Sequence, residues 1–385
     1  MASNHYDVIV IGVGSMGSST CYYLAKNGVR VLGLEQFDIP NQLSSHTGQS
    51  RIIRKAYYEH PDYVPLLQRA YDNWQVLEKK SGKQVYYKTG LLYAGAPGSD
   101  MIQGVKLAAK VNSIEVNLLD HTSVKNWYPA LHIPDHFEIL FEPDAGFVRP
   151  ELAITTYCSL ANQLGAEIKS NVKVQSWQKT KTGYEVTTTG ETYVADKLVF
   201  TAGPWAGSLL PEWSSKLKVT RQMLAWMNTR NNGQFELGNF PCWMIKDEGY
   251  PGVYYGFPVL PNAQFDGPIG FKLAYHYPGE IADPDHLDRT PKELDEKLLV
   301  DFMNRFFPDQ YQSTLEMKAC MYTNSPDEIF ILDFLPGHDQ HVVVATGFSG
   351  HGFKFVSVIG EIMSDLAIKG KTELPIEFLR ASRFY

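Results

Sequence analysis

Cysteine is scarce in this sequence of 385 residues, and its four positions form no pattern. They are Cys21, Cys158, Cys242 and Cys320. There is neither a C-x-x-C pair nor a Cys/His spacing typical of a metal site. We therefore expect the reduced thiols of a cytoplasmic protein and no bound metal. Long apolar runs are also lacking, so no membrane span is expected. The short polar start leads into a strand-like segment, which does not fit a signal peptide.

Basic residues are in short supply as well. There are 35 Lys and Arg against 42 Asp and Glu, a net charge of -7, which gives no electrostatic case for nucleic acid or an anionic membrane as a partner. The chain is long enough for two domains, each with its own core. Aromatic residues are abundant, with 22 Tyr, 20 Phe and 7 Trp. They fit a large apolar ligand or an aromatic core, and composition leaves both open.

Residues 6–36 show the pattern of a dinucleotide-binding βαβ unit. The apolar residues 8–11 predict a buried strand, residues 18–26 a helix, and residues 29–34 a second buried strand. A G-x-G-x-x-G turn joins the first strand to the helix, and an acid, Glu35, closes the second strand. This context favours a nucleotide site over a glycine-rich turn without a ligand.

Each glycine of this turn has a separate physical task. Gly12 permits the tight turn, Gly14 lets the backbone approach a pyrophosphate, and Gly17 lets helix and strand pack closely. Glu35 would accept hydrogen bonds from a ribose, and its charge disfavours the extra phosphate of NADP. The motif alone does not separate FAD from NAD. The predicted cofactor-binding residues of this unit are Gly12, Gly14, Ser15, Met16, Gly17 and Glu35.

A polar loop at residues 44–50 leads to two arginines, Arg51 and Arg54. Cations beside a nucleotide motif would bind pyrophosphate, flavin or a substrate carboxylate, and a solvated basic turn is the alternative. Further along, the strand at 198–201 ends in a small-residue turn, Ala202-Gly203. Such a turn at the carboxyl end of a strand is where an open α/β sheet holds a ligand.

The rest of the chain predicts two kinds of structure. Residues 166–189 read as a meander of three strands, and residues 216–301 as antiparallel strands that roof the nucleotide domain. Residues 86–94 read as one strand, and 112–150 as strand and loop. Near the end, a buried strand is followed by a second glycine loop and a helix over 353–368.

Four motifs make the chain resemble the monomeric sarcosine oxidase family of flavin-dependent amine oxidases, which includes N-methyltryptophan oxidase. They are GVGSMG, SHTGQSRIIRKAY, KACMYTNSPDE with FILDFLPGH, and GFSGHGFKF. Similar blocks such as YYGFP and FKLAYH extend the likeness over nearly the whole chain. The resemblance implies FAD, held covalently through a thioether to a cysteine. Cys320 in KACMYT is the matching cysteine, although by itself it reads as an ordinary buried thiol.

The resemblance also implies roles for polar side chains. Arg51 matches an arginine beside the flavin ring, whereas Arg54 and Lys354 match two cations that hold the substrate carboxylate. Lys272 matches a lysine that faces the flavin and promotes its reaction with oxygen. The residues that match the family's amine site are Tyr255, His276, Tyr322, Gly350 and His351. Structural hydrogen bonds for the histidines and core positions for the tyrosines are the alternatives. The remaining expected cofactor contacts are Ser45, Ser50, Val174, Ala202, Gly203, Gly347, Gly350, Gly352 and Lys354.

One segment departs from the family pattern. The family often reads SHHGDTR where this chain reads SHTGQSR, with Thr47, Gln49 and Ser50 at the altered positions. The second histidine and the acid are absent. We therefore expect different hydrogen bonding near the flavin and a different redox potential.

We predict an α/β protein with a Rossmann-like FAD-binding domain and a mainly antiparallel-sheet substrate domain, interleaved along the chain. The FAD-binding domain is expected to comprise residues 1–85, 146–215 and 320–385. The substrate domain is expected to comprise residues 86–145 and 216–319. Because the two glycine loops lie at opposite ends of the chain, one domain must be built from distant segments.

The predicted activity is oxidation of the secondary amine of an N-methyl amino acid. The product imine would hydrolyse to an aldehyde and an amine, and oxygen would be reduced to hydrogen peroxide. An oxidase or dehydrogenase of a primary or cyclic amino acid, such as glycine, proline or pipecolate, is an alternative. A non-catalytic nucleotide-binding or redox-sensing protein is another. The expected partners are the amine and oxygen, and a monomer is expected. The side chain of the substrate is not predicted.

Overall fold

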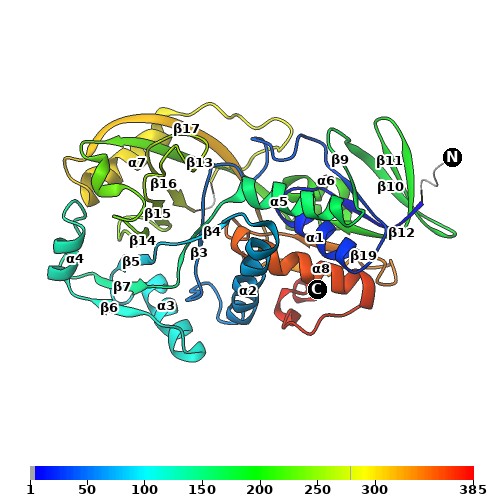
Figure 1. Cartoon of the computed structure of the whole chain (residues 1–385), viewed down its shortest axis with the longest axis horizontal. Coiled ribbons are helices and arrows are strands. Elements are labelled where there is room, and N and C mark those ends of the chain that lie inside the picture. The colour runs from blue at the N-terminus through cyan, green and yellow to red at the C-terminus, as the bar shows by residue number, and fades with distance from the viewer. Residues whose placement is uncertain (1–4, 278) are drawn as a thin grey trace.

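The computed structural model describes residues 5–277 and 279–385, and this part of the chain contains three β-sheets. Figure 1 shows the first sheet in its right half, beside helices α1 and α8, and the second sheet in its left half. Strands β3 and β4 of the small third sheet lie between them (Figure 1). Residues 1–4 of the predicted FAD-binding domain and residue 278 of the predicted substrate domain lie outside the described residues.

The first sheet has a parallel centre with antiparallel strands beside it. Its order is β10-β11-β12-β1-β2-β9, and β19 and β18 continue from β12. Four pairs are parallel: β1 with β2, β1 with β12, β2 with β9, and β12 with β19. Three pairs are antiparallel: β10 with β11, β11 with β12, and β18 with β19. The strands are β1 His5–Ile11, β2 Val31–Leu34, β9 Glu167–Lys169, β10 Val174–Thr180, β11 Gly183–Thr188, β12 Thr192–Phe200, β18 Ile331–Phe334 and β19 Val342–Thr346.

Four helices that are distant in sequence pack together over this sheet. α1 (Ser15–Lys26) contacts both α5 (Pro150–Gln163) and α8 (Val356–Lys369), and α8 also contacts α2 (Tyr63–Ser81). Their apolar faces form one buried cluster with residues of β1 and β19. The N-terminal and C-terminal segments therefore share one core, because neither can bury its apolar face alone.

The second sheet is mainly antiparallel, in the order β17-β13-β16-β15-β14-β5-β7-β6. One pair, β14 with β5, is parallel. The strands are β5 Leu91–Gly95, β6 Asn117–Leu119, β7 Glu138–Glu142, β13 Lys218–Thr229, β14 Cys242–Lys246, β15 Val253–Phe257, β16 Phe271–His276 and β17 Tyr311–Asn324. The other α-helices of the described residues are α3 Asp100–Asn112, α4 His121–Trp127, α6 Ala206–Leu209 and α7 Glu293–Phe306. The predicted fold class is confirmed.

Two predicted strand arrangements are wrong. β9 is not part of a meander, because it pairs in parallel with β2 after the crossover through α5. The stretch predicted as one strand over 86–94 is two, β4 (Tyr86–Lys88) and β5, in different sheets. Gly90 separates them at a φ of +72°, where an added Cβ would meet the Phe141 ring at 2.2 Å. The chain therefore turns at a point that period-2 alternation does not reveal.

The sequence also missed helix α4 in the stretch predicted as strand and loop. Its N-cap is Asp120, whose carboxylate accepts a hydrogen bond from the Ser123 backbone N–H at 2.9 Å. An aspartate at this position is a recognised start of a helix, so the signal was present in the sequence.

The sheets do not divide where the predicted domains do. β17 continues to Asn324 in the second sheet, whereas the predicted FAD-binding domain resumes at residue 320. The third sheet joins β3 (Arg51–Ile53) and β8 (Gly146–Val148) to β4, which the prediction gave to the substrate domain. A split of the chain into two interleaved domains stays a proposal.

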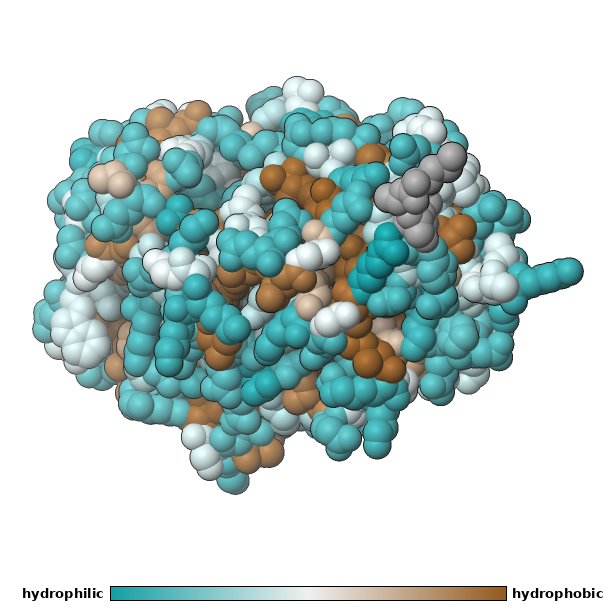
Figure 2. Space-filling view, turned by 45° about the vertical axis from the view of Figure 1, so that its right-hand side comes forward, coloured by the Kyte–Doolittle hydropathy of each residue, from teal (hydrophilic) through white to brown (hydrophobic). Residues whose placement is uncertain are grey.

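Within the described ranges, no helix has both the length and the apolar character needed to cross a bilayer. Among the same residues, no three His, Cys, Asp or Glu side chains are grouped to hold a metal ion. Figure 2 shows one face of the molecule, on which hydrophilic side chains surround smaller hydrophobic areas.

Candidate active site

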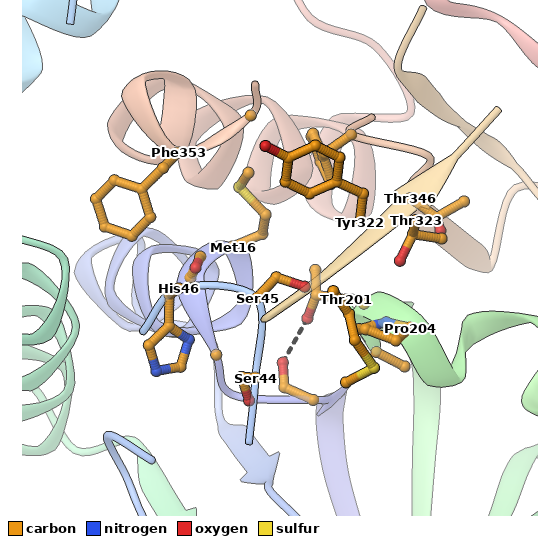
Figure 3. Close-up of a pocket in the computed structure, with 18 of the residues that line it drawn as sticks. Met16, Ser44, Ser45, His46, Thr201, Pro204, Tyr322, Thr323, Thr346 and Phe353 are labelled. Atoms are coloured by element: carbon orange, nitrogen blue, oxygen red, sulfur yellow. Dashed lines mark hydrogen bonds between the residues drawn. The ribbon is translucent and has the colours of Figure 1, made fainter. Parts of the chain in front are cut away.

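A cavity of about 580 Å³ lies at the carboxyl edge of the first sheet. The residues that follow β1, β2, β12 and β19 line it; they are Gly12, Glu35, Thr201 and Gly347. Parallel strands bring their carboxyl ends to the same edge, where open α/β sheets bind ligands. Strand β17 of the second sheet closes another side of the cavity with Cys320, Met321, Tyr322 and Thr323. Figure 3 shows Met16, Ser45, Thr201 and Tyr322 around this space.

The first glycine turn has the geometry that a dinucleotide requires. An added Cβ on Gly17 would lie 1.9 Å from the Gly12 carbonyl oxygen, so Gly17 provides the close packing of helix and strand. An added Cβ on Gly14 would meet only the His46 ring, at 3.8 Å, so this glycine faces open cavity. The N-cap of helix α1 is Gly14, which has no side chain to cap the helix, so the first N–H groups are left to an anion. These residues fit the pyrophosphate of FAD.

Glu35 lines the cavity directly after β2. Its carboxylate accepts hydrogen bonds from the backbone N–H groups of Val13 at 2.9 Å and Phe37 at 3.1 Å. Burial raises its pKa to about 7, in spite of these bonds. Further hydroxyl donors would favour the ionised form, which suits a ribose.

Cys320 on β17 and Arg51 at the start of β3 both line the cavity. The Cys320 thiol is buried, and burial raises its pKa, while Arg51 opposes this effect. The Arg51 guanidinium donates to the carbonyl oxygens of Ser45 at 3.0 Å, Thr47 at 2.6 Å and Ser50 at 2.9 Å. Arg51 therefore fixes the backbone of the 44–50 loop by three hydrogen bonds, and it also lines the cavity.

Two further cations, Arg54 and Lys354, line the same cavity from distant segments. Arg54 donates to both carboxylate oxygens of Glu59, at 2.5 Å and 2.6 Å, and lies over the Tyr57 and Tyr58 rings. The Lys354 ammonium donates to the His351 carbonyl oxygen at 2.6 Å. Burial and the nearby Arg54 charge lower the pKa of Lys354 to about 7.

The histidines of the predicted amine site are neutral at neutral pH; His351 is buried and His276 is half-buried. His276 Nδ1 lies 3.2 Å from the Tyr322 hydroxyl, and His351 Nδ1 bonds the Tyr57 hydroxyl. Burial lowers the pKa of His276 to about 4 and that of His351 to about 3. Tyr255 also lines the cavity, and burial raises its pKa.

The structure brings almost all predicted site residues to this one cavity, including Gly14 and Gly350 from opposite ends of the chain. Three do not line it. Gly17 lies under the helix start, and Ser50 is fully buried. Lys272 is absent from the cavity lining as well, and its ammonium donates to the carbonyl oxygens of Gly48 and Ser50 and to the Ser50 hydroxyl. That Lys272 faces the cofactor stays a prediction. The spacing of residues in the sequence does not reveal that the Lys272 ammonium meets the oxygen atoms of Gly48 and Ser50.

Sequence reasoning missed Glu59 and Met244, which also line the cavity. Glu59 is held by Arg54, which lowers its pKa to about 2. The signal for Glu59 was an acid five residues after a predicted ligand-binding arginine. No local pattern marks Met244 as a site residue, because it lines the cavity only once β14 has taken its place in the second sheet.

The fold and the cavity define an enzyme that binds an adenine dinucleotide. A family model described as FAD dependent oxidoreductase matches residues 7–366. The chain is 39% identical over 374 residues to monomeric sarcosine oxidase of Streptomyces avermitilis, covering 96% of each. It is 34% identical over 385 residues to N-methyl-L-tryptophan oxidase of Yersinia pestis, covering 98% of this chain and 99% of the relative. The chain therefore belongs to the FAD-dependent oxidoreductases, in the family of these two oxidases.

A solved structure has the same fold. NikD, an amino acid oxidase of nikkomycin biosynthesis, superposes with a TM-score of 0.85 at 23% identity, covering 98% of this chain and 97% of NikD. The predicted family and FAD dependence are confirmed.

Proposed function

We propose that the protein oxidises the secondary amine of an N-methyl amino acid. The observation that carries this proposal is the pair of cations, Arg54 and Lys354, on the wall of the same cavity as the dinucleotide turn. FAD, when bound, accepts a hydride equivalent from the C–H bond next to the amine. The imine product then hydrolyses to an aldehyde and an amine, and oxygen becomes hydrogen peroxide. The two curated relatives are named for substrates of this class.

The residues of the first sheet would hold the cofactor. The Gly12–Gly14 turn and the start of α1 would bind its pyrophosphate, and Glu35 its ribose. Ala202 and Gly203, which border the cavity after β12, would contact the dinucleotide from the adjacent strand end. An added Cβ on Gly203 would meet no atom within 4 Å, so the backbone is open to a ligand there.

The cation pair would fix the substrate by its carboxylate. Arg54 suits a planar carboxylate because its guanidinium donates two parallel hydrogen bonds, and Lys354 supplies a second charge from another segment. Glu59 must give up at least part of its contact with Arg54 for this to occur. The neutral His276 and His351 place no positive charge beside the amine, and the amine must be uncharged to react.

We propose that Cys320 attaches the flavin through a thioether, since this thiol borders the cavity on β17. The thiol and a ring methyl group together lose two hydrogen atoms when this bond forms, and oxygen is the acceptor. We also propose that Lys272 promotes the reaction with oxygen by stabilising developing negative charge. A monomer in the cytoplasm is our proposal for the state of the protein.

An absorption spectrum before and after acid precipitation tests flavin content and attachment. We expect a yellow protein whose flavin stays with the precipitate, whereas Cys320→Ala should release it into solution. Retention of covalent flavin by Cys320→Ala would assign the attachment to another residue.

Oxygen uptake and peroxide release over a panel of amines test the substrate. The panel contains sarcosine, N-methyltryptophan, N-methylalanine, glycine, proline and pipecolate. We expect turnover of N-methyl amino acids and a large loss of kcat/KM in Arg54→Gln. Preference for glycine, proline or pipecolate would contradict the proposed substrate and support a primary or cyclic amino acid. A flavin that no amine reduces would refute amine oxidation itself.

A further inference from the structure

Gln49, at one of the positions that depart from the family pattern, connects the 44–50 loop to the second sheet. Both ends of its side-chain amide are used. The oxygen accepts a hydrogen bond from the Trp226 indole N–H on β13 at 2.7 Å. The nitrogen donates to the carbonyl oxygens of Asp266 at 2.5 Å and Pro268 at 3.3 Å, in the loop between β15 and β16.

The local backbone is shaped around this amide. Gln49 has a φ of +66°, a left-handed conformation that costs free energy for a residue other than glycine. Gly267 has a φ of +108°, and an added Cβ there would lie 2.6 Å from the Gln49 amide nitrogen. The loop between β15 and β16 therefore needs a glycine at the point where the amide rests.

Lys272 is held by the residues on either side of Gln49. Its ammonium donates to the carbonyl oxygen of Gly48, to the Ser50 carbonyl oxygen at 2.9 Å and to the Ser50 hydroxyl at 3.1 Å. Lys272 is also the cross-strand partner of Trp226, and its ammonium lies 5.4 Å from the centre of the Trp226 ring. Gln49 thus accepts a hydrogen bond from Trp226, the cross-strand neighbour of Lys272, and lies in the chain between Gly48 and Ser50, whose carbonyl oxygens hold the Lys272 ammonium.

We propose that Gln49 is a positioning residue for Lys272. Its amide ties the loop to the second sheet, keeps the carbonyls of Gly48 and Ser50 in place, and thereby sets the rate at which oxygen oxidises the reduced flavin. The inference rests on the oxygen role proposed for Lys272. It gives a task to a residue that replaces an acid in the family pattern, because a carboxylate has no N–H to donate to the Asp266 and Pro268 carbonyls.

The test separates reduction of the flavin from its reoxidation. Gln49→Glu keeps the size of the side chain and an acceptor for Trp226, and loses both donors. Protein reduced anaerobically with dithionite is mixed with oxygen, and flavin absorbance gives the reoxidation rate. Reduction by the best amine is measured separately. We expect reoxidation to slow about tenfold in Gln49→Glu, and reduction by the amine to slow much less.

Two further variants show whether Gln49 acts through Lys272. Gln49→Glu added to Lys272→Met should slow reoxidation no more than Lys272→Met alone. An unchanged rate in Gln49→Glu, or effects of the two substitutions that multiply in full, would overturn the proposal. If Gln49→Glu does not fold, Trp226→Phe, which removes the indole donor together with one of the two fused rings, should still slow reoxidation. The parent rate in Trp226→Phe would then overturn the proposal.

The outcomes also distinguish this inference from the proposed function. If no amine reduces the parent flavin but Lys272→Met slows reoxidation after dithionite, the proposed substrate fails and the positioning role stands. If Lys272→Met reacts with oxygen like the parent, the oxygen role of Lys272 fails and the positioning role with it.

Discussion

Binding of a substrate carboxylate should take up a proton at Lys354. Burial and Arg54 lower the pKa of this ammonium to about 7, so about half of the free protein carries a neutral Lys354 at pH 7. A carboxylate bound at Lys354 favours the charged form. The affinity of the protein for the carboxylate is therefore highest below pH 7 and falls as the pH rises through the pKa of Lys354.

The magnitude follows from one proton taken up for each carboxylate bound. Well above pH 7 the affinity should fall about tenfold per pH unit, which gives roughly a 50-fold loss between pH 7 and pH 9. An amine substrate adds the opposite dependence, because its reactive form is uncharged. The measurement therefore uses a carboxylate without an oxidisable amine, such as the ether analogue of sarcosine, and follows the flavin spectrum from pH 6 to pH 9.

Matched variants identify the titrating group. Lys354→Met should bind the carboxylate more weakly and with little dependence on pH. Glu35 has a pKa raised by burial to about 7 and titrates in the same range at the other end of the cavity, so Glu35→Gln should keep the parent slope. A parent affinity that is constant from pH 6 to pH 9, or an equal slope in Lys354→Met, would show that Lys354 does not take up the proton.

Other residues of the cavity give further predictions. Glu59→Gln removes the charged group that competes with the substrate for Arg54, so carboxylate affinity should rise about tenfold. The melting temperature of this variant should fall, because the buried Arg54 guanidinium loses its counter-charge. Weaker binding in a spectral titration would contradict this. Gly17→Ala should lower the free energy of unfolding by about 3 kcal/mol or more, since its Cβ would lie 1.9 Å from the Gly12 oxygen. Gly14→Ala should leave denaturant unfolding nearly unchanged and lower the flavin content of the purified protein; equal destabilisation by both alanines would be inconsistent with the geometry.

Local patterns predicted the parts of the structure that depend on a short stretch of chain. The dinucleotide unit, with its strand, glycine turn, helix and acid, spans about thirty residues. Its pattern is visible in the sequence because each glycine is required by the backbone conformation or close packing of the neighbouring residues. The second glycine loop and the cations at positions 51, 54 and 354 were likewise identified by their local sequence. The structure brings these segments to a single cavity.

The errors concern partners that the chain reaches only after folding. β9 was assigned to a meander, although its neighbour β2 precedes it by more than a hundred residues. The break between β4 and β5 depends on Phe141, whose ring leaves no room for a side chain at Gly90. Periodicity measures which face of a strand is buried and does not identify the strand beside it.

By itself, the sequence determined the chemistry available to this protein: a turn for a dinucleotide, a thiol in a family motif, and cations for an anionic substrate. Tertiary structure alone decided which groups meet. It paired Tyr57 with His351, bonded the Lys272 ammonium to the carbonyls of the 48–50 segment, and set the Gln49 amide between two elements of the second sheet. The physical reason is that a local pattern reflects backbone conformation and burial, whereas hydrogen bonds between distant segments depend on where the whole chain places each donor and acceptor.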